Sequence, residues 1–163
     1  MAKTVNHMQA AFNRQINNEL ANSAVYLSMA AWCESQDLKG IASHFRKQSD
    51  EERSHAMKLF DHAADRFWLV SITGLALPPQ EWASVPELLT FAYMLEQKTT
   101  ADIKGLVALA EEEHDSQACQ LLLWFANEQV QEEADIELWL SKAKRAGEGV
   151  GLYLLDREMG GEA

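Results

Sequence analysis

A carboxylate and an imidazole lie three residues apart in the first half of the chain, in the segment Glu51-Glu52-Arg53-Ser54-His55. Residues three apart share one face of a helix, so Glu52 and His55 would point the same way. The same face carries, at steps of three and four, Ile41, Phe45, Gln48 and Leu59. This row is predicted to be the buried stripe of the helix. An unpaired buried ion costs several kcal/mol, so these two side chains need partners.

Three further segments also place acids in apolar rows with helical spacing. The rows read Phe12, Ile16, Glu19, Ser23, Tyr26, Leu27 and Ala30; Leu89, Ala92, Glu96, Thr99, Ile103, Leu106 and Ala110; and Leu121, Phe125, Glu128, Glu132, Ile136, Trp139 and Ala143. A single acid of this kind could be a surface residue in a helix whose phase is misread. Four rows with acids at matching depth are harder to explain in that way. Carboxylates that converge in a core repel one another unless they are protonated or share cations, so the pattern predicts a metal site.

The types of ligand narrow the choice of metal. Oxygen ligands with one imidazole suit iron or manganese better than structural zinc, which favours cysteine and histidine in closed tetrahedra. Zinc is the alternative, as an adventitious occupant. Bridging carboxylates would hold two ions close together, and open coordination positions would let dioxygen bind and accept electrons. The predicted chemistry is therefore oxidation at a two-metal centre.

Four long helices and one short helix are needed to carry these rows. They are predicted to span about Val5 to Gln36, Leu38 to Arg66, Pro86 (after a Ser84 cap) to Glu113-His114-Asp115, Ser116 to Ala146, and Val150 to Met159. The short turn after the first helix indicates antiparallel neighbours, and Gly147 ends the fourth helix. The fold class is predicted to be all-α, in one domain over 1–163, with a bundle over about 5–146 and a short C-terminal helix over about 150–159.

The connection from Phe67 to Val85 differs from the rest of the chain. It holds Gly74, Pro78 and Pro79, and it lacks helical periodicity. A connection of this length inside a compact chain needs a reason. A crossover that spans the whole bundle would provide one, and the helices on either side of it would then run parallel. A linker between domains is the alternative, which the apolar content of the segment disfavours.

Composition bounds the class of protein. The chain has 163 residues, which favours one domain. Its formal net charge of -11 argues against a nucleic-acid or anionic-membrane partner. No apolar run approaches the ~20 residues of a membrane span, and the first residues lack the apolar core of a signal peptide. The two cysteines, Cys33 and Cys119, form no CxxC pattern, so a cytoplasmic location is expected.

The order and spacing of the acids resemble the di-iron site of ferritin-like proteins. That site has a Glu on the first helix, Glu-x-x-His on the second and Glu on the third. On the fourth helix, bacterioferritins, rubrerythrins and ribonucleotide reductase small subunits place a second Glu-x-x-His, whereas this chain has Glu128-Gln129-Val130-Gln131-Glu132. This stretch resembles the non-haem ferritins, as do Asn18-Glu19-Leu20, Ala31-Trp32-Cys33 and Gly147-Glu148-Gly149. The chain is thus similar to bacterial-type non-haem ferritins over almost its whole length.

The resemblance implies a set of iron ligands. Glu19 and His55 would ligate one iron, and Glu52 would bridge it to a second iron. Glu96 and Glu132 would ligate the second iron. These roles come from the matched positions of the motif.

The resemblance also implies roles for neighbours of the site. Gln129 would lie beside the pair and orient water. Tyr26 would adjoin the site as an electron donor or a guard against radicals, with an ordinary core tyrosine bonded to a carboxylate as the alternative. Trp124 would lie near the same site, with core packing as the favoured alternative. A third iron site would be built from Glu51, Glu128 and Glu132, and the neutral amide of Gln131 should weaken it.

By this resemblance, the protein would store and detoxify iron. It would oxidise Fe²⁺ with dioxygen or hydrogen peroxide and deposit ferric mineral inside a cage of identical subunits, expected to number 24, without haem. One alternative is another ferritin-like di-iron oxidase or a peroxide scavenger, and the missing second Glu-x-x-His disfavours it. The others are a storage-only subunit and a haem-containing bacterioferritin.

Overall fold

The structure of the protein is a computed structural model that describes residues 6–161. Its helices are α1 (His7–Ser35), α2 (Lys39–Asp65), α3 (Val85–Glu112), α4 (Ser116–Ala146) and α5 (Val150–Met159). The predicted bounds of α4 and α5 agree with these, and the ends of α2 and α3 differ from prediction by one to three residues. The predicted start at Val5 lies outside the described residues. The all-α prediction is confirmed.

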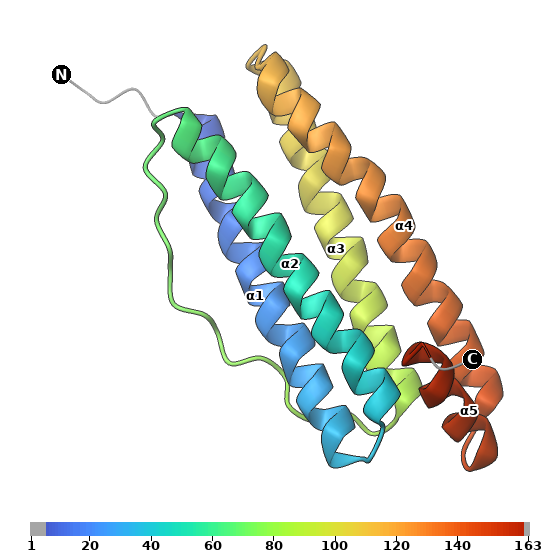
Figure 1. The fold of residues 1–163 in the computed structure, drawn as a ribbon. Helices are drawn as coiled ribbons and strands as arrows, with labels where there is room; N and C mark the ends of the chain where they lie inside the picture. Colours follow the sequence, from blue (N-terminus) through green and yellow to red (C-terminus); the bar gives the residue numbers. More distant parts are fainter. Residues whose placement is uncertain (1–5, 162–163) are drawn as a thin grey trace.

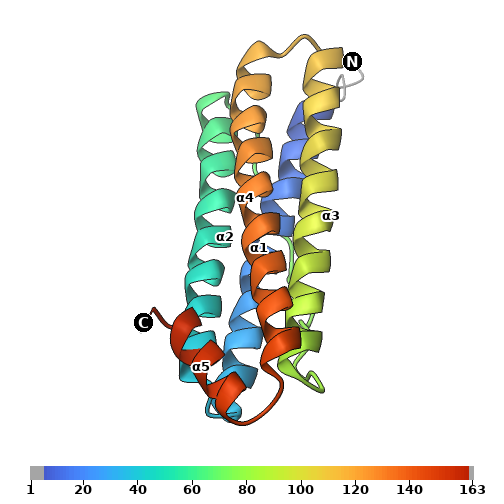
Figure 2. The same ribbon diagram turned by 90° about the vertical axis from the view of Figure 1, so that its right-hand side faces the viewer.

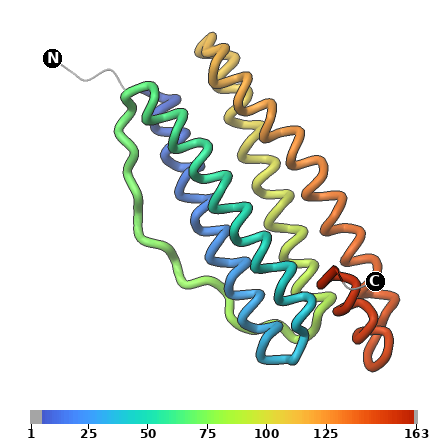
Figure 3. Tube along the Cα trace, in the orientation of Figure 1, coloured from blue at the N-terminus to red at the C-terminus, as the bar shows by residue number. Residues whose placement is uncertain are grey.

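The four long helices form two antiparallel hairpins, α1 with α2 and α3 with α4, joined by a crossover over residues 66–84 (Figure 1). The crossover, green in the tube trace, runs the length of the bundle, so α2 and α3 are parallel (Figure 3). Turned by 90°, the view shows α5 lying across one end of the bundle against α2 and α4 (Figure 2). The predicted four-helix bundle with one long crossover is therefore confirmed.

Two asparagines on α1 hold the crossover against the bundle. Asn13 donates to the carbonyl of Leu69 at 2.9 Å and accepts from the amide of Ser71 at 2.6 Å. Asn17, one turn later, donates to the Ser71 carbonyl and accepts from the Thr73 amide, at 2.9 and 2.8 Å. Each side-chain amide thus satisfies backbone groups as a neighbouring strand would. This explains how a segment without helix or sheet can have a defined path.

The helix ends follow from local chemistry, with one exception. Ser84 accepts from the amide of Glu87, which confirms the predicted cap of α3. No side-chain cap forms at the start of α2 from its own N-cap residue, Leu38. Asp156 of α5 supplies one instead, since its Oδ1 accepts from the amide of Ile41 at 2.9 Å. The last helix of the chain therefore completes the first turn of the second.

The interior consists of two apolar clusters with a polar layer between them. One cluster, near α5, includes Tyr26, Met29, Phe45, Leu89 and Leu140, and the other, at the far end, includes Phe12, Ile16, Leu59, Ile103 and Leu122. The layer between holds the buried polar side chains Gln15, Glu19, Asn22, Ser49, Glu52, His55, Glu96, Thr99 and Gln129. The two apolar clusters thus fix the helices above and below a layer of groups that are costly to bury.

Three predicted rows need correction. On α2, Gln48 is half-buried and the neighbouring Ser49 is buried instead. The α3 row is buried throughout, but on α1 Leu27 is 55% exposed and Ser23 only half-buried, while Asn22 is buried. On α4 the buried stripe is turned by one position and reads Leu122, Phe125, Gln129, Ile136, Leu140 and Ala143. Glu128 and Glu132 are consequently half-buried, at the edge of the stripe. An amide is less costly to bury than a carboxylate, which explains why Gln129 occupies the inner position.

Candidate metal centre

Glu19, Glu52 and His55 meet in the polar layer. One ligand atom from each lies within 4.8 Å of the others, and the three residues are 0%, 2% and 6% exposed. Glu19 comes from α1, and α2 supplies both Glu52 and His55, which lie three residues apart and so share one face of the helix. Within residues 6–161, this is the one group of three or more His, Cys, Asp or Glu residues whose ligand atoms lie close enough to hold one metal ion.

One oxygen of Glu19 lacks a hydrogen-bond donor as long as the neighbouring Glu52 carboxyl is ionised. The Oε1 atom of Glu19 accepts from the side-chain amide of Gln15 at 2.7 Å, but its buried Oε2 has no hydrogen-bond partner. A buried acceptor without a partner costs about 1–3 kcal/mol, and more when it is charged. A cation beside Glu52 and His55 would satisfy this oxygen. The donor set, two carboxylates and one imidazole, fits iron or manganese.

Electrostatics also favour a cation here. Burial raises the pKa of Glu52 well above its ordinary value, and the negative charge of Glu19 raises it further. The amide of Asn22 donates to Glu52 at 3.3 Å and partly offsets this rise in pKa. Without cations, the raised pKa of Glu52 favours its protonated form, and bound metal ions would displace that proton.

Glu96 lies in the same layer but outside the cluster of three. It is buried on α3, where the Tyr26 hydroxyl donates to its Oε1 and the Gln129 amide donates to its Oε2 at 3.1 Å. Burial raises the pKa of Glu96, and these two hydrogen bonds oppose the rise. Burial also raises the pKa of the Tyr26 phenol well above its ordinary value, so Tyr26 is protonated and acts as the donor.

Glu132 lies at the edge of the layer, on α4. Burial raises its pKa to about 8, and the charges of Glu96, Glu51, Asp135 and Glu128 contribute to the rise. The structure thus brings three of the five predicted ligands within ligand range of one another. It places Glu96 and Glu132 near one another, on α3 and α4.

The residues of the predicted third site lie on the face between α2 and α4. Glu51 is exposed and accepts from Gln48 at 2.6 Å, and Glu128 is half-buried. Gln131 donates to Asp135 at 2.7 Å, one turn along α4. In the described part of the chain, these acids do not form a cluster of three with ligand atoms in range. The third site stays a prediction.

Trp124 packs against the metal centre from the same face. Its ring lies edge-on to the His55 imidazole, with centroids 5.9 Å apart, and the Lys58 ammonium lies 4.2 Å from its centroid. The residue is 37% exposed. Trp124 therefore lies near the site, and it also packs against the core residue Phe125, with ring centroids 4.9 Å apart.

Two polar residues of the centre are absent from the predicted rows: Gln15 and Asn22. Gln15 lies one turn before Glu19, and Asn22 lies three residues after it, so both share its face. Asn22 also donates to the Thr99 hydroxyl at 3.1 Å, which joins α1 to α3. Their spacing from Glu19 could have predicted that both amides face the interior. Their hydrogen-bond partners can be identified only from the fold.

Comparison with known proteins identifies the family. A family model described as a ferritin-like domain matches residues 9–146. The chain belongs to the ferritin family. This ferritin is 35% identical over 149 residues to a probable bacterial non-haem ferritin-like protein of Haemophilus influenzae, covering 91% of this chain and 90% of the relative. It is 34% identical over 148 residues to a bacterial non-haem ferritin of Escherichia coli O6:H1, covering 90% of each chain.

Solved structures agree with this family. The ferritin fold of this chain matches an open-pore ferritin from the hyperthermophilic archaeon Archaeoglobus fulgidus, with a TM-score of 0.93, 37% identity and 98% of each chain covered. The resemblance to non-haem ferritins noted in the sequence is confirmed, and the buried cluster is consistent with an iron site in a ferritin. Within the described residues, no helix combines the length and apolar character needed to cross a membrane.

Proposed function

We propose that this ferritin stores iron by oxidising Fe²⁺ at the buried cluster and depositing the ferric product as mineral. The observation that carries the proposal is the unpartnered Oε2 of Glu19 beside Glu52 and His55. The names of the relatives, bacterial non-haem ferritins, support the same reading. Iron is both the substrate of the centre and the cargo of the protein.

In this proposal, each residue has a defined task. Glu19 and His55 hold one ferrous ion, and Glu52 bridges it to a second, which Glu96 and Glu132 complete. The bonds from Tyr26 and Gln129 orient the Glu96 carboxylate without adding charge. As iron binds, Glu52 and Glu132 release the protons that their raised pKa values retain.

Tyr26 and the third site are further parts of the proposal. Tyr26 is in direct contact with a proposed ligand, Glu96, so it is placed to supply an electron as well as to orient the carboxylate. Glu51, Glu128 and Glu132 would take ferric ions on their way to the mineral. Occupancy there should be weak, because Gln131 offers a neutral amide and is bonded to Asp135.

The test compares two histidines of the same helix. His55→Ala removes the imidazole from the cluster, while His44→Ala removes one that contacts Phe45 and Trp139 instead. Loss of a ligand should lower the rate of Fe²⁺ oxidation at least ~10–100-fold, the range seen when only a supporting residue is lost. His44→Ala should keep the wild-type rate. Stopped-flow absorbance of ferric product measures both, and equal rates in the two variants would remove the cluster from the mechanism.

A further inference from the structure

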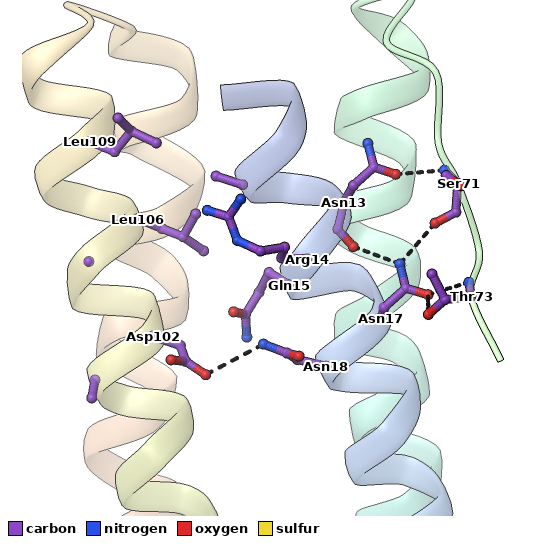
Figure 4. Close-up of a pocket in the computed structure, with 13 residues that line it drawn as sticks. Asn13, Arg14, Gln15, Asn17, Asn18, Ser71, Thr73, Asp102, Leu106 and Leu109 are labelled. Carbon is purple, nitrogen blue, oxygen red and sulfur yellow. Dashed lines mark hydrogen bonds between the residues drawn. The ribbon is translucent and has the colours of Figure 1, made fainter. Parts of the chain in front are cut away.

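An open trough with a volume of about 700 Å³ lies on the face between α1 and α3 (Figure 4). We call it the α1/α3 trough. Amide and hydroxyl side chains from α1 and the crossover line it, among them Asn18, Asn17 and Thr73, and the small residues Ala101 and Gly105 of α3 form its other side. The two hairpins meet along this face, opposite the one formed by α2 and α4.

The floor of the trough reaches the metal centre. Gln15 lines the trough, is 3% exposed and donates to Oε1 of Glu19 at 2.7 Å. One side chain therefore separates the trough from a carboxylate of the cluster. About two turns further along α1, Asn22 lies in the polar layer rather than in the trough, and it donates to Glu52 and Thr99.

The charges in the trough do not suit a cation. Its one carboxylate, Asp102, is already paired with Lys98 at 2.5 Å and accepts from Asn18 at 3.5 Å. The guanidinium of Arg14 lines the same space. Arg14 in the trough and Lys98 beside Asp102 place two positive groups against one carboxylate. The α2/α4 face has more acids, since it carries Glu51, Glu128 and Asp135 alongside Lys58.

The amides of Asn13 and Asn17 are occupied by the crossover. Within the described residues, Gln15 and Asn18 each donate one hydrogen bond. The rest of each of these two amides matches a small uncharged molecule that both donates and accepts.

We propose that the α1/α3 trough admits hydrogen peroxide to the metal centre, while Fe²⁺ reaches the centre from the acidic α2/α4 face. The inference rests on the proposed function and adds the route of the oxidant. In the reaction, two Fe²⁺ each give one electron to one H₂O₂, the O–O bond breaks, and two protons are taken up to form two water molecules. Separate routes keep the oxidant away from iron that has not yet bound.

Gly105 offers a test that leaves the ligands untouched. A Cβ added there meets no atom within 4 Å, so a larger side chain has room to occupy the trough. Gly105→Phe would place a ring in it. Gly105→Ala keeps the trough open with the same backbone change, and Ala108→Phe adds the same ring to an exposed position of α3 outside the trough.

Three measurements on the assembled protein decide the proposal. Peroxide-driven oxidation of bound Fe²⁺ should slow by about tenfold in Gly105→Phe, equivalent to about 1.4 kcal/mol of barrier. Oxidation by dioxygen, which is small, apolar and not dependent on hydrogen bonds, should change less. Anaerobic Fe²⁺ binding should be unchanged, and both controls should behave as wild type in all three measurements.

Other outcomes would overturn the proposal. Wild-type peroxide rates in Gly105→Phe would show that the trough is not the route, and slower anaerobic binding would show that iron uses it. If Gly105→Phe does not fold, Ala101→Leu narrows the same trough from another exposed position and is measured in its place. If the wild-type protein oxidises no iron with either oxidant, the proposed function itself fails and this inference fails with it.

Discussion

Neutral amides surround the buried acids of the metal centre. Three of them each donate to one carboxylate: Gln15 to Glu19, Asn22 to Glu52 and Gln129 to Glu96. An amide orients a carboxylate without neutralising it, so the negative charge stays available to a cation. Among the buried side chains of residues 6–161, none is a lysine or arginine. The proposed ligands are therefore ordered by hydrogen bonds, and no buried lysine or arginine among residues 6–161 would compete with a bound metal ion.

This arrangement predicts that the metal-free protein loses stability as pH rises. Folding raises the pKa of Glu52 and Glu96, and that of Glu132 to about 8, above the unfolded value of about 4.3. Between these values the native state binds more protons than the unfolded chain, so the free energy of unfolding falls with increasing pH. Chemical denaturation of the metal-free protein at several pH values from about 5 to 8 measures how the free energy of unfolding changes with pH. This range lies between the unfolded pKa of a glutamate and the pKa of about 8 for Glu132.

Two matched variants, each replacing a carboxylate by an amide, test the source of this pH effect. Glu52→Gln removes one titrating buried carboxylate, so it should make the slope shallower and stabilise the metal-free protein at pH values near 8. Asp50→Asn makes the same chemical change at an exposed position of α2 and should leave the slope unchanged. A stability that is flat or rises with pH in the metal-free wild type would contradict the raised pKa values.

At this scale, the sequence predicted the acids better than their partners. A carboxylate in an apolar row is conspicuous, so Glu19, Glu52 and Glu96 could be found by spacing alone. An amide in such a row is common, and its role depends on which side chain of another helix faces it. Asn22 is the clearest case, because its partners on α2 and α3 lie 30 and 77 residues away.

At the scale of elements, α5 acts on the helix that carries Glu52 and His55. Gly40, in the first turn of α2, packs against the backbone of α5, and the neighbouring Ile41 amide donates to Asp156. The contact needs a residue without a Cβ at position 40. A Cβ there would lie 1.8 Å from the carbonyl oxygen of Asp156. The end of the bundle is therefore closed by backbone packing as well as by apolar side chains.

Gly40→Ala is expected to displace α5. The clash is with backbone rather than with a flexible side chain, so the helix must move and the Asp156 cap is lost, which alone costs about 0.5–2 kcal/mol. The melting temperature should fall, and hydrogen exchange should accelerate in α5 and in the first turn of α2. Gly105→Ala is the matched control. Its Cβ meets nothing, so it should be neutral or stabilise by about 0.5–1 kcal/mol.

The predictions of helices and connections were correct where the apolar periodicity of a segment agrees with the positions of proline and glycine at its ends. The bounds of α4 and α5, the Ser84 cap and the crossover all followed from proline, glycine and the apolar period. The phase of α4 did not, because its apolar residues are spread widely enough to fit two adjacent stripes. The packing of Gly40 against α5 was also beyond reach, since it depends on a contact with a helix more than 100 residues later.

At the scale of the whole molecule, large apolar side chains remain exposed on one subunit. In the crossover, Phe67, Leu69 and Leu77 are 98%, 75% and 81% exposed. On α5, Val150, Tyr153 and Leu154 form an exposed face at helical spacing. Contiguous exposed apolar surface is typical of protein–protein interfaces. This supports the proposed assembly of many identical subunits, expected to be 24.

A charge placed on this surface should weaken the assembly. Leu77→Asp puts a carboxylate where apolar contact with a neighbour is expected, and it should shift the population to smaller species. Gln80→Asp adds the same charge to an exposed polar position of the same segment and should leave the assembly intact. Light scattering after size-exclusion chromatography gives the mass of each species. A wild-type protein that runs as a monomer would contradict the proposed cage.

The cap that Asp156 provides also ties the metal centre to the order in which the ribosome makes the chain. The Ile41 amide donates to a side chain that is synthesised 115 residues later. On a shorter nascent chain, the first turn of α2 therefore lacks this hydrogen bond. α3 and α4, which carry Glu96 and Glu132, are also made in that interval. Iron is therefore expected to load after translation has passed α5, and ribosome-bound chains stalled before Asp156 would hold the metal less tightly.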